Sequence, residues 1–263
     1  GVKKRIIHSH QAYPPENWLQ RTRRRISVPG LLRSATDFAA CGRMAGEWLY
    51  GSEMMESGRV QILHNAVSPG RYAFSGESRE RLRRELGIDR DTVALGHVGR
   101  FSRQKNHALT VRIFAEFSRR HRDCVLLLAG DGELRQDTEK QVRELGLEEK
   151  VRFLGIRQDV PELLSAMDLF LLPSRWEGLC FVMIEAQMNG LPAVCSSYVS
   201  RDVKLADNVF FTADHAYDDP AAWSCLMEKA LSAGRGDYRE AVAAAGYDIC
   251  REAKKPEELY RGV

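Results

Sequence analysis

Long hydrophobic runs are missing from these 263 residues, because no stretch approaches the ~18 apolar residues of a membrane span. The six cysteines include no CxxC pair and no metal-ligand spacing, so neither a disulfide framework nor a zinc site is expected. The formal net charge is only +3, which favours neither nucleic acid nor a strongly acidic partner. We therefore expect a cytoplasmic protein with reduced thiols that does not bind nucleic acid.

The sequence also lacks an initiating methionine and begins in a basic strand, which predicts that it is part of a longer protein. A basic segment follows at residues 18–25, with arginines at 21, 23, 24 and 25. Two interpretations of this segment stay open. It is either the solvated face of a helix or a patch that contacts an anionic surface such as the inner face of a membrane.

Strands and helices alternate from Val93 to Val194, and the strands are apolar and rich in β-branched residues. Such runs predict an α/β protein with a parallel sheet that helices cover on both faces. Ligands of these sheets bind beyond the carboxyl ends of the strands. The residues that directly follow the predicted strands are therefore candidates for a site, and they include Arg100, Lys105, Gly130, Ile156 and Glu177.

The loop after the strand at 93–98 reads Gly99-Arg100-Phe101-Ser102-Arg103-Gln104-Lys105-Asn106, and a helix is expected from His107. A strand, a basic loop and a helix start are the layout of a phosphate site. Arginine can fork onto two phosphate oxygens, and lysine supplies a compact charge. The alternative is an ordinary solvated loop.

The stretch from Leu169 to Val194 predicts a strand, a polar turn, a helix from about Cys180 to Asn189 and a second strand. Glu177 lies in the turn and Glu185 eight residues later in the helix. The backbone N–H groups between them, from Gly178 to Val182, form a helix N-terminus, which attracts anions. An acid, an anion cradle and a second acid suit a nucleotide-sugar, although two surface acids remain the alternative interpretation.

The segment EGLCFVMIEAQMNGLPAV, residues 177–194, resembles the signature of the family 4 glycosyltransferases. The likeness is closest to the exopolysaccharide and capsule members, in which the helix often reads IEAQ. It implies the GT-B type of α/β fold, with a Rossmann-like doubly wound parallel sheet in a C-terminal donor domain. It also implies that part of a second Rossmann-like domain precedes that domain.

The resemblance places residues 1–67 in a partial N-terminal, acceptor-side domain and residues 68–263 in the donor domain. The sequence pattern predicts one helix from Tyr238 to Arg251. The last helices are expected to pack back toward the N-terminal domain. The loop His64-Asn65-Ala66-Val67 matches the family's interdomain loop, except that Ala66 replaces the usual glycine. A full N-terminal half would need roughly another 100 residues at its front.

Several roles are implied residue by residue. Gly99, Arg100 and Lys105 match the family's GR and K-N positions, and Gly130 matches a glycine turn beside the ligand. Glu177 would hold the sugar hydroxyls. Glu185 would accept hydrogen bonds from the ribose hydroxyls.

The anion cradle between these two acids carries the backbone groups of Gly178, Leu179, Cys180, Phe181 and Val182. With Arg100 and Lys105, it would hold the diphosphate without a metal. Cys180 stands where glycine or proline is usual. It is either a packed small residue or a thiol whose pKa the helix N-terminus lowers.

Ile156 and Arg157 lie in a turn that the resembled enzymes place against the nucleotide base, and Arg157 either stacks there or is solvated. His8 and His10 end the first strand, where those enzymes often carry a histidine that faces the sugar. Which of the two corresponds stays open.

The implied reaction is the retaining transfer of a sugar from a UDP- or GDP-sugar to a glycan or lipid-linked acceptor. The implied process is the synthesis of exopolysaccharide, capsule or another surface glycan. Two alternatives stay open, a noncatalytic nucleotide-sugar-binding domain and a nucleotide-sugar epimerase. The sugar, the base, the acceptor, any general base and the oligomeric state are not assigned.

Overall fold

The computed structural model describes residues 1–10, 18–177 and 179–261. Its contacts divide the chain into two compact units, one formed by Gly1–Ala66 with Ile249–Val263 and the other by Val67–Asp248. The sequence placed the division after residue 67 and kept residues 68–263 in one domain. The contacts group residues 249–263 with the first unit, the side toward which the last helices were expected to pack.

The first unit holds a three-stranded parallel sheet in the order β1-β2-β3. The hydroxyl of Tyr50 is 2.8 Å from the carbonyl oxygens of Ile7 and Ala39, and this contact holds a helix on the sheet. Its elements are β1 (Ile6–Ser9), α1 (Trp18–Ser34), β2 (Asp37–Ala40), α2 (Arg43–Tyr50), α3 (Ser52–Glu56), β3 (Val60–Ile62), α12 (Ile249–Glu252) and α13 (Lys254–Arg261).

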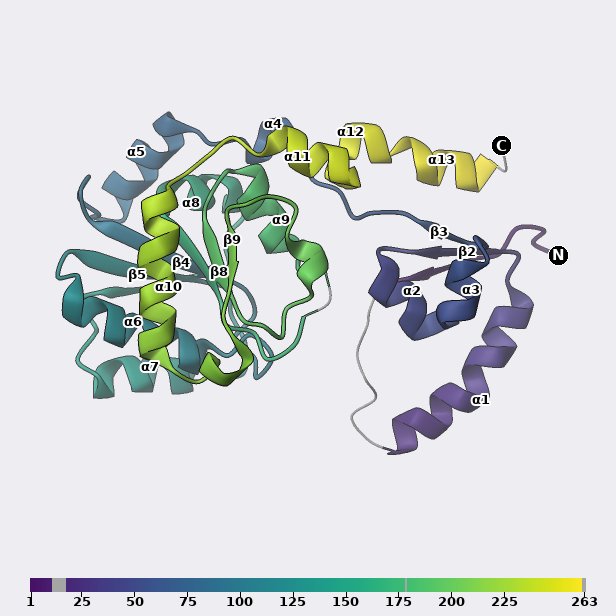
Figure 1. Ribbon diagram of the computed structural model, residues 1–263, viewed down its shortest axis with the longest axis horizontal. Helices are drawn as coiled ribbons and strands as arrows, with labels where there is room; N and C mark the ends of the chain where they lie inside the picture. The colour runs from purple at the N-terminus through teal and green to yellow at the C-terminus, as the bar shows by residue number, and fades with distance from the viewer. Residues whose placement is uncertain (11–17, 178, 262–263) are drawn as a thin grey trace. The chain divides into compact units, whose positions relative to one another are not determined.

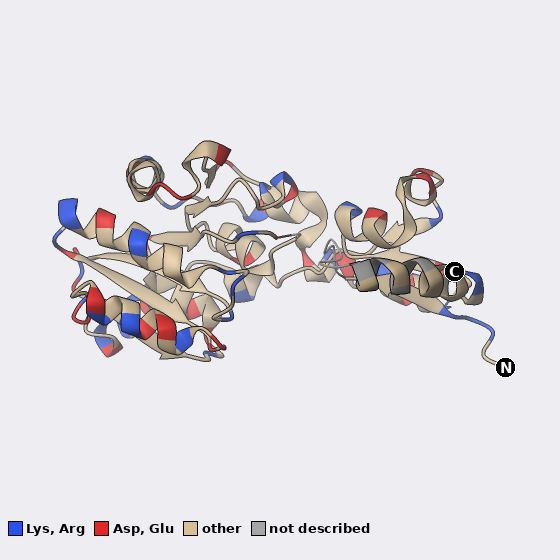
Figure 2. Cartoon of the chain, turned by 90° about the horizontal axis from the view of Figure 1, so that it is seen from below, with Lys and Arg blue, Asp and Glu red and all other residues tan. Residues whose placement is uncertain are grey.

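The basic segment predicted at 18–25 begins α1, but the side chains of its arginines lie outside the described residues. Its contact with an anionic membrane therefore stays a prediction. No helix among the described residues is long and apolar enough to cross a membrane. Basic and acidic positions are interspersed along the helices, in agreement with the small net charge (Figure 2).

The second unit is built on a six-stranded sheet in the order β6-β5-β4-β7-β8-β9, and all of its pairs are parallel. Its strands are β4 (Val93–Val98), β5 (Cys124–Ala129), β6 (Val151–Gly155), β7 (Leu169–Leu172), β8 (Ala193–Cys195) and β9 (Val209–Phe211). Its helices are α4 (Pro69–Tyr72), α5 (Gly76–Glu85), α6 (His107–Arg120), α7 (Arg135–Glu144), α8 (Val160–Ala166), α9 (Phe181–Met188), α10 (Pro220–Ala233) and α11 (Arg239–Val242).

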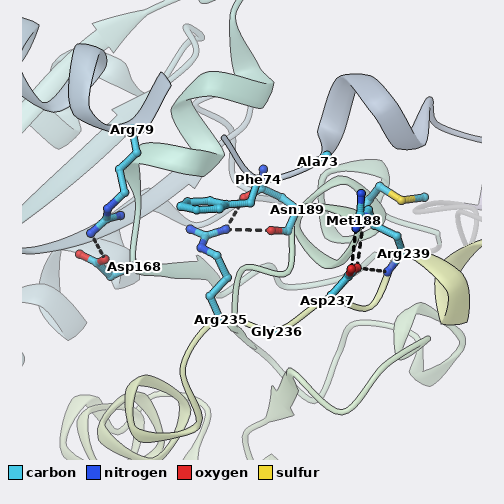
Figure 3. Close-up of a pocket in the computed structure, with 10 residues that line it drawn as sticks. All are labelled: Ala73, Phe74, Arg79, Asp168, Met188, Asn189, Arg235, Gly236, Asp237 and Arg239. Atoms are coloured by element: carbon cyan, nitrogen blue, oxygen red, sulfur yellow. Dashed lines mark hydrogen bonds and ion pairs between the residues drawn. The ribbon is translucent and has the colours of Figure 1, made fainter. Parts of the chain in front are cut away.

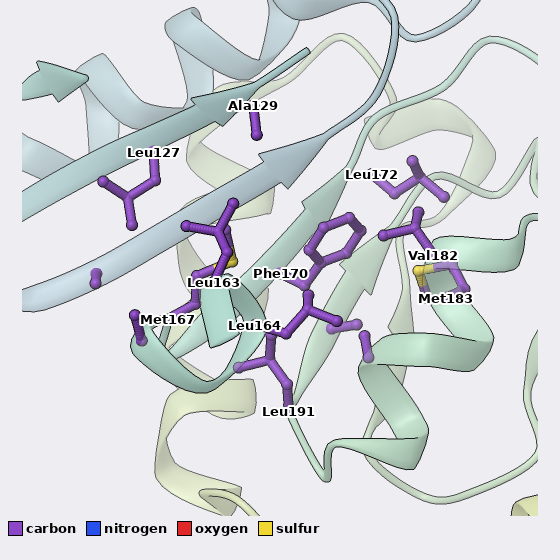
Figure 4. Close-up of a cluster of buried hydrophobic side chains, with 14 of the residues drawn as sticks. Leu127, Ala129, Leu163, Leu164, Met167, Phe170, Leu172, Val182, Met183 and Leu191 are labelled. Carbon is purple, nitrogen blue, oxygen red and sulfur yellow. The ribbon is translucent and has the colours of Figure 1, made fainter. Parts of the chain in front are cut away.

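Helices cover both faces of this sheet (Figure 1). Because side chains alternate along a strand, Phe170 and Leu172 join the core under α5, α8 and α9, whereas Leu169 and Leu171 join the core under α6, α7 and α10. Figure 4 shows the first of these cores, where each fully buried Leu or Phe contributes about 1.5–3 kcal/mol. The predicted doubly wound parallel sheet is confirmed.

The predicted single helix from Tyr238 to Arg251 is wrong. Gly246 has a φ of 92°, a left-handed conformation that ends the helical run after α11. Asp248 is then extended and pairs with Val67, so the chain enters and leaves the second unit side by side.

Three arginines bind the carboxyl end of α8, whose last carbonyl groups have no partner within the helix. Arg79 donates to the carbonyls of Ser165, Ala166 and Met167 at 3.1–3.3 Å. Arg83 donates to Ala166 at 3.1 Å, and Arg235 donates to Met167 at 2.7 Å.

These arginines lie at the amino edge of the sheet, where Arg79 and Arg235 line a cavity of about 620 Å³ beside Asp168 (Figure 3). The guanidinium of Arg235 also donates to Asn189 and lies over the ring of Phe74. These guanidinium groups bind the carbonyls at the end of α8, and that of Arg79 also binds Asp168, so the arginines hold α8 in place.

Replacing Arg235 tests this view of the amino edge. Arg235→Met should lower the free energy of unfolding by about 2–4 kcal/mol, because buried carbonyls lose their donors. Arg112→Met is the matched control, since Arg112 is exposed and reaches a single carbonyl, that of Asp218. Urea denaturation measures both variants, and equal midpoints would contradict the role assigned to Arg235.

Candidate active site

The strand order reverses between β4 and β7, and a crevice beyond the carboxyl ends of strands at such a point is where open α/β sheets bind ligands. Two loops flank this point, residues 99–106 after β4 and residues 173–180 after β7. They are joined directly, because Arg175 N donates to Gln104 O at 2.8 Å. They are also joined through Tyr217, whose hydroxyl accepts from Asn106 at 2.7 Å and donates to Pro173 at 3.1 Å.

Lys105 and Glu177 meet at this switch point. Lys105 Nζ is 2.7 Å from Glu177 Oε1, and the two side chains are 17% and 8% exposed. The same carboxylate oxygen accepts a 2.9 Å hydrogen bond from the hydroxyl of Ser174. Two residues expected on separate loops thus form one buried ion pair.

The thiol of Cys180 completes this cluster, with Sγ 3.5 Å from Lys105 Nζ. Burial raises the pKa of Cys180 to about 11, so the alternative of a lowered thiol pKa is wrong. Burial alone would lower the pKa of Lys105, but Cys180 and Glu177 outweigh it and raise that pKa. Since the thiol is protonated at neutral pH, Glu177 is the anion that balances the lysine.

Helix α9 begins beside this pair with Cys180 as its N-cap, and no described side chain is bonded to its terminus. The amide of Met183 donates to Cys180 O at 3.0 Å, and Phe181 and Val182 occupy the first turn before it. Leu179 is partly buried against the core. Gly178 lies outside the described residues.

Glu185 is half-buried on α9 and accepts a 2.7 Å hydrogen bond from the hydroxyl of Tyr72. Burial raises the pKa of this carboxyl, and the bond to Tyr72 and the charge of Arg71 oppose that rise. Both acids of the motif are therefore placed in partly buried sites and held by a hydroxyl.

The loop after β4 packs tightly on the turn after β5. Gly130 has a φ of 134°, and a Cβ there would lie 2.0 Å from Gly99 O, so glycine is required at this position. Arg100 extends from the same loop, is 74% exposed and pairs with Glu133 at 3.1 Å. The structure thus places Gly99, Arg100 and Gly130 together beyond adjacent strands.

Ile156 and Arg157 follow β6. Ile156 is 74% exposed. Arg157 is turned toward acids, with Nε 2.8 Å from Asp159 and Nη1 3.6 Å from Glu85. The hydrogen bond to Asp159 raises the pKa of Arg157. Any role of these two residues toward a base stays a prediction.

His8 and His10 belong to the first unit, where their ring centroids are 4.0 Å apart. Burial, and then the neighbouring His10, lowers the pKa of His8. His8 Nε2 is buried and has no hydrogen-bond partner among the described residues, whereas His10 Nδ1 is 3.5 Å from Asn65 Nδ2. Which histidine faces a sugar stays open.

Sequence reasoning missed the supporting residues of the site. His97 is fully buried with Nδ1 2.7 Å from Leu171 O, and its ring is 4.5 Å from that of His107. His107 in turn stacks on Phe101 at 3.8 Å. The sequence HVGRFSRQKNH shows two histidines around the basic loop, which was the available signal. No group of three His, Cys, Asp or Glu in the described part of the chain is placed to hold a metal.

Comparison with known proteins decides the family. Residues 78–248 match the family of glycosyl transferases group 1. The chain belongs to this family. The expected membership of glycosyltransferase family 4 is thereby confirmed, and the loops described above lie within the matched residues.

Two named relatives are similar to this chain over different shares of its length. The putative glycosyltransferase EpsF of Bacillus subtilis is 34% identical over 254 residues, which are 94% of this chain and 66% of EpsF. An Escherichia coli UDP-Gal:alpha-D-GlcNAc-diphosphoundecaprenol alpha-1,3-galactosyltransferase is 32% identical over 149 residues, 53% of this chain and 37% of that enzyme. This chain thus spans about two thirds of EpsF and a smaller share of the second relative.

Solved structures confirm the GT-B type of fold. The Anabaena protein HepE, crystallised with UDP, matches with a TM-score of 0.77 at 23% identity, over 98% of this chain and 72% of HepE. A glycosyltransferase from Rickettsia africae matches with a TM-score of 0.73 at 14% identity, over 98% of this chain and 70% of that protein.

The buried imidazole of His107 predicts how stability depends on pH. Burial, and then the charge of Lys105, lowers the pKa of His107 to about 3, below the ordinary value of 6.5. Between pH 6.5 and 3, His107 therefore binds a proton in the unfolded chain but not in the folded chain. The contribution of His107 to the free energy of unfolding is fully present well above pH 6.5. It is lost as the pH falls from 6.5 toward 3, by roughly 2 kcal/mol at pH 5.

The variant His107→Phe, which can keep the stack on Phe101, should flatten this slope, and His97 should supply the remainder. His215→Phe is the control, because His215 is exposed. Urea denaturation between pH 5 and 8 measures each slope. Equal slopes for wild type and His107→Phe would contradict the prediction.

Proposed function

We propose that this chain binds a nucleotide-diphospho-sugar at the carboxyl edge of its second unit and transfers the sugar to an acceptor hydroxyl with retained anomeric configuration. The observation that carries the proposal is the buried Lys105–Glu177 ion pair at the strand-order reversal, beside the start of α9, which no described side chain caps. A cation, an anion and a helix N-terminus lie together where this fold class binds ligands.

Stabilising the departing diphosphate is the first chemical task of this reaction. Lys105 has three donors, of which one reaches Glu177 and another the sulfur of Cys180. On this proposal, the remaining donor, the first-turn amides of α9 and the exposed Arg100 bind phosphate oxygens. Fixed positive groups in a partly buried site stabilise developing negative charge strongly, and we propose that they do so without a metal.

Orienting the donor is the second task, and the two acids suit it. Glu177 Oε1 accepts from both Lys105 and Ser174, and no described residue donates to its Oε2. That oxygen is placed to accept a sugar hydroxyl. Glu185 is proposed to accept a ribose hydroxyl from the α9 side, so the two acids bind opposite ends of the donor.

The relatives support a UDP-sugar and a surface-glycan acceptor. The Escherichia coli relative is named for a UDP-galactose donor and a diphosphoundecaprenol-linked acceptor. HepE has been solved with UDP-glucose. We propose a glycan or lipid-linked acceptor. Any role of His8 or His10 toward the sugar stays a prediction.

Nucleotide binding tests the donor site. Calorimetric titration with UDP, GDP and ADP should show tight binding of one of them. Glu185→Ala should weaken it about tenfold or more, since a hydrogen bond to a charged group is worth about 1.5–3 kcal/mol. Lys105→Met should weaken it at least as much. Lys140→Met is the control, because Lys140 is a surface lysine paired only with Glu144 in the described chain.

Thermal melts of each variant must show that it is folded, since removing Lys105 leaves Glu177 buried without its cation. Unchanged affinity in both site variants would place the nucleotide elsewhere and contradict the proposal.

Product analysis tests the reaction. With the bound nucleotide's sugar and a lipid-linked acceptor, proton NMR of the product should show the anomeric configuration of the donor. The rate should be unchanged when EDTA removes divalent cations. An inverted product or loss of the reaction in EDTA would contradict the proposed mechanism. Tight binding without turnover would instead select the noncatalytic binding domain.

A further inference from the structure

Tyr72 ends the short helix α4 and is held against α9 at two points. Its hydroxyl donates to Glu185 Oε1 at 2.7 Å, and its carbonyl oxygen accepts from Asn189 Nδ2 at 3.0 Å. The ring packs against both neighbouring clusters of buried residues, including Ile184 and Met188 of α9. The hydroxyl therefore has a fixed place and a fixed partner.

The bond to Tyr72 leaves the two oxygens of Glu185 unequal. Oε1 is occupied, whereas no described residue donates to Oε2. A carboxylate held by one oxygen cannot turn freely about its last bond, so its second oxygen has a defined direction. A ligand hydroxyl that reaches Oε2 then meets an acceptor that needs no further ordering.

We propose that Tyr72 is a positioning residue for nucleoside recognition, which fixes Glu185 Oε1 so that Oε2 accepts a ribose hydroxyl. The inference rests on the proposed function of Glu185 as the ribose-binding acid. Tyr72 touches the acid and acts on the nucleotide only through it.

The pH dependence of nucleotide binding provides a second test of this role, because it depends on the pKa of Glu185. Burial raises the pKa of the carboxyl, while the Tyr72 hydroxyl and the charge of Arg71 oppose the rise. Glu162 is the further charged group that acts on Tyr72. Removing the hydroxyl alone therefore raises the pKa of Glu185, and the acid limb of nucleotide binding moves to higher pH.

The test is calorimetric titration of the whole chain with UDP, or with GDP or ADP if wild type prefers that nucleotide. Tyr72→Phe should weaken binding about tenfold, because the ring stays and only the hydroxyl is lost. In a Glu185→Ala background the same change should have less than a twofold effect. Tyr50→Phe is the matched control, since it removes a buried hydroxyl from the first unit.

Two further titrations separate positioning from a general loss of structure. Between pH 5.5 and 8, Tyr72→Phe should lose affinity at a higher pH than wild type, while the titration of the nucleotide itself is common to both. With the 2′-deoxy or the 3′-deoxy nucleotide, whichever lacks the hydroxyl bound by Glu185, the difference between Tyr72→Phe and wild type should shrink.

The outcomes distinguish this inference from the proposed function. If wild type binds a nucleotide and Glu185→Ala weakens it while Tyr72→Phe does not, the role of Tyr72 is overturned and the donor site stands. An equal loss in the Glu185→Ala background, or an unmoved acid limb, also overturns that role. Flat titrations of wild type with all three nucleotides overturn both proposals for this chain.

Discussion

The parallel pairing of β4 with β7 is the constraint on which the site depends. Leu95 lies opposite Leu169 and Gly96 opposite Phe170, so two strands distant in sequence become neighbours where the strand order reverses. The side chain of Met167 fills the space left by Gly96, because a Cβ on Gly96 would lie 2.1 Å from the sulfur of Met167. Once the strands are paired, the loop that carries Lys105 and the loop that carries Glu177 emerge side by side, and their ion pair follows from the sheet.

Burying that pair is acceptable only if its surroundings are otherwise uncharged. Burial raises the pKa of Cys180 and lowers those of His97 and His107, so thiol and imidazoles are all neutral near pH 7. A second positive charge beside Lys105 would repel it in a region where water screens little. The neutral neighbours therefore leave one cation, Lys105, and one anion, Glu177, in this cluster.

Sequence pattern predicted the parts of this structure that are local. Apolar runs indicated β4 to β8, and the loops after them indicated the carboxyl edge, because both depend on residues that are close in the chain. The helix expected at 238–251 failed where Gly246 became left-handed, a conformation that the three alanines before it did not reveal. The partner of Tyr72 was equally hidden, since the bond from Tyr72 to Glu185 joins residues 113 apart. Motif likeness supplied the acids, but only the packed fold shows what holds them.

The two acids of the motif are held in the same way by groups of different origin. Ser174 binds Glu177 from three residues away on the same loop, so that carboxylate is oriented by local geometry. Tyr72 reaches Glu185 from α4, where the chain enters the second unit. On the proposed function, the sugar end of the donor is bound by Glu177, whose carboxylate is oriented by a residue of its own loop. The nucleoside end is bound by Glu185, whose orientation depends on how α4 packs against α9. Substitutions in α4 that do not contact the ligand would then alter nucleotide affinity.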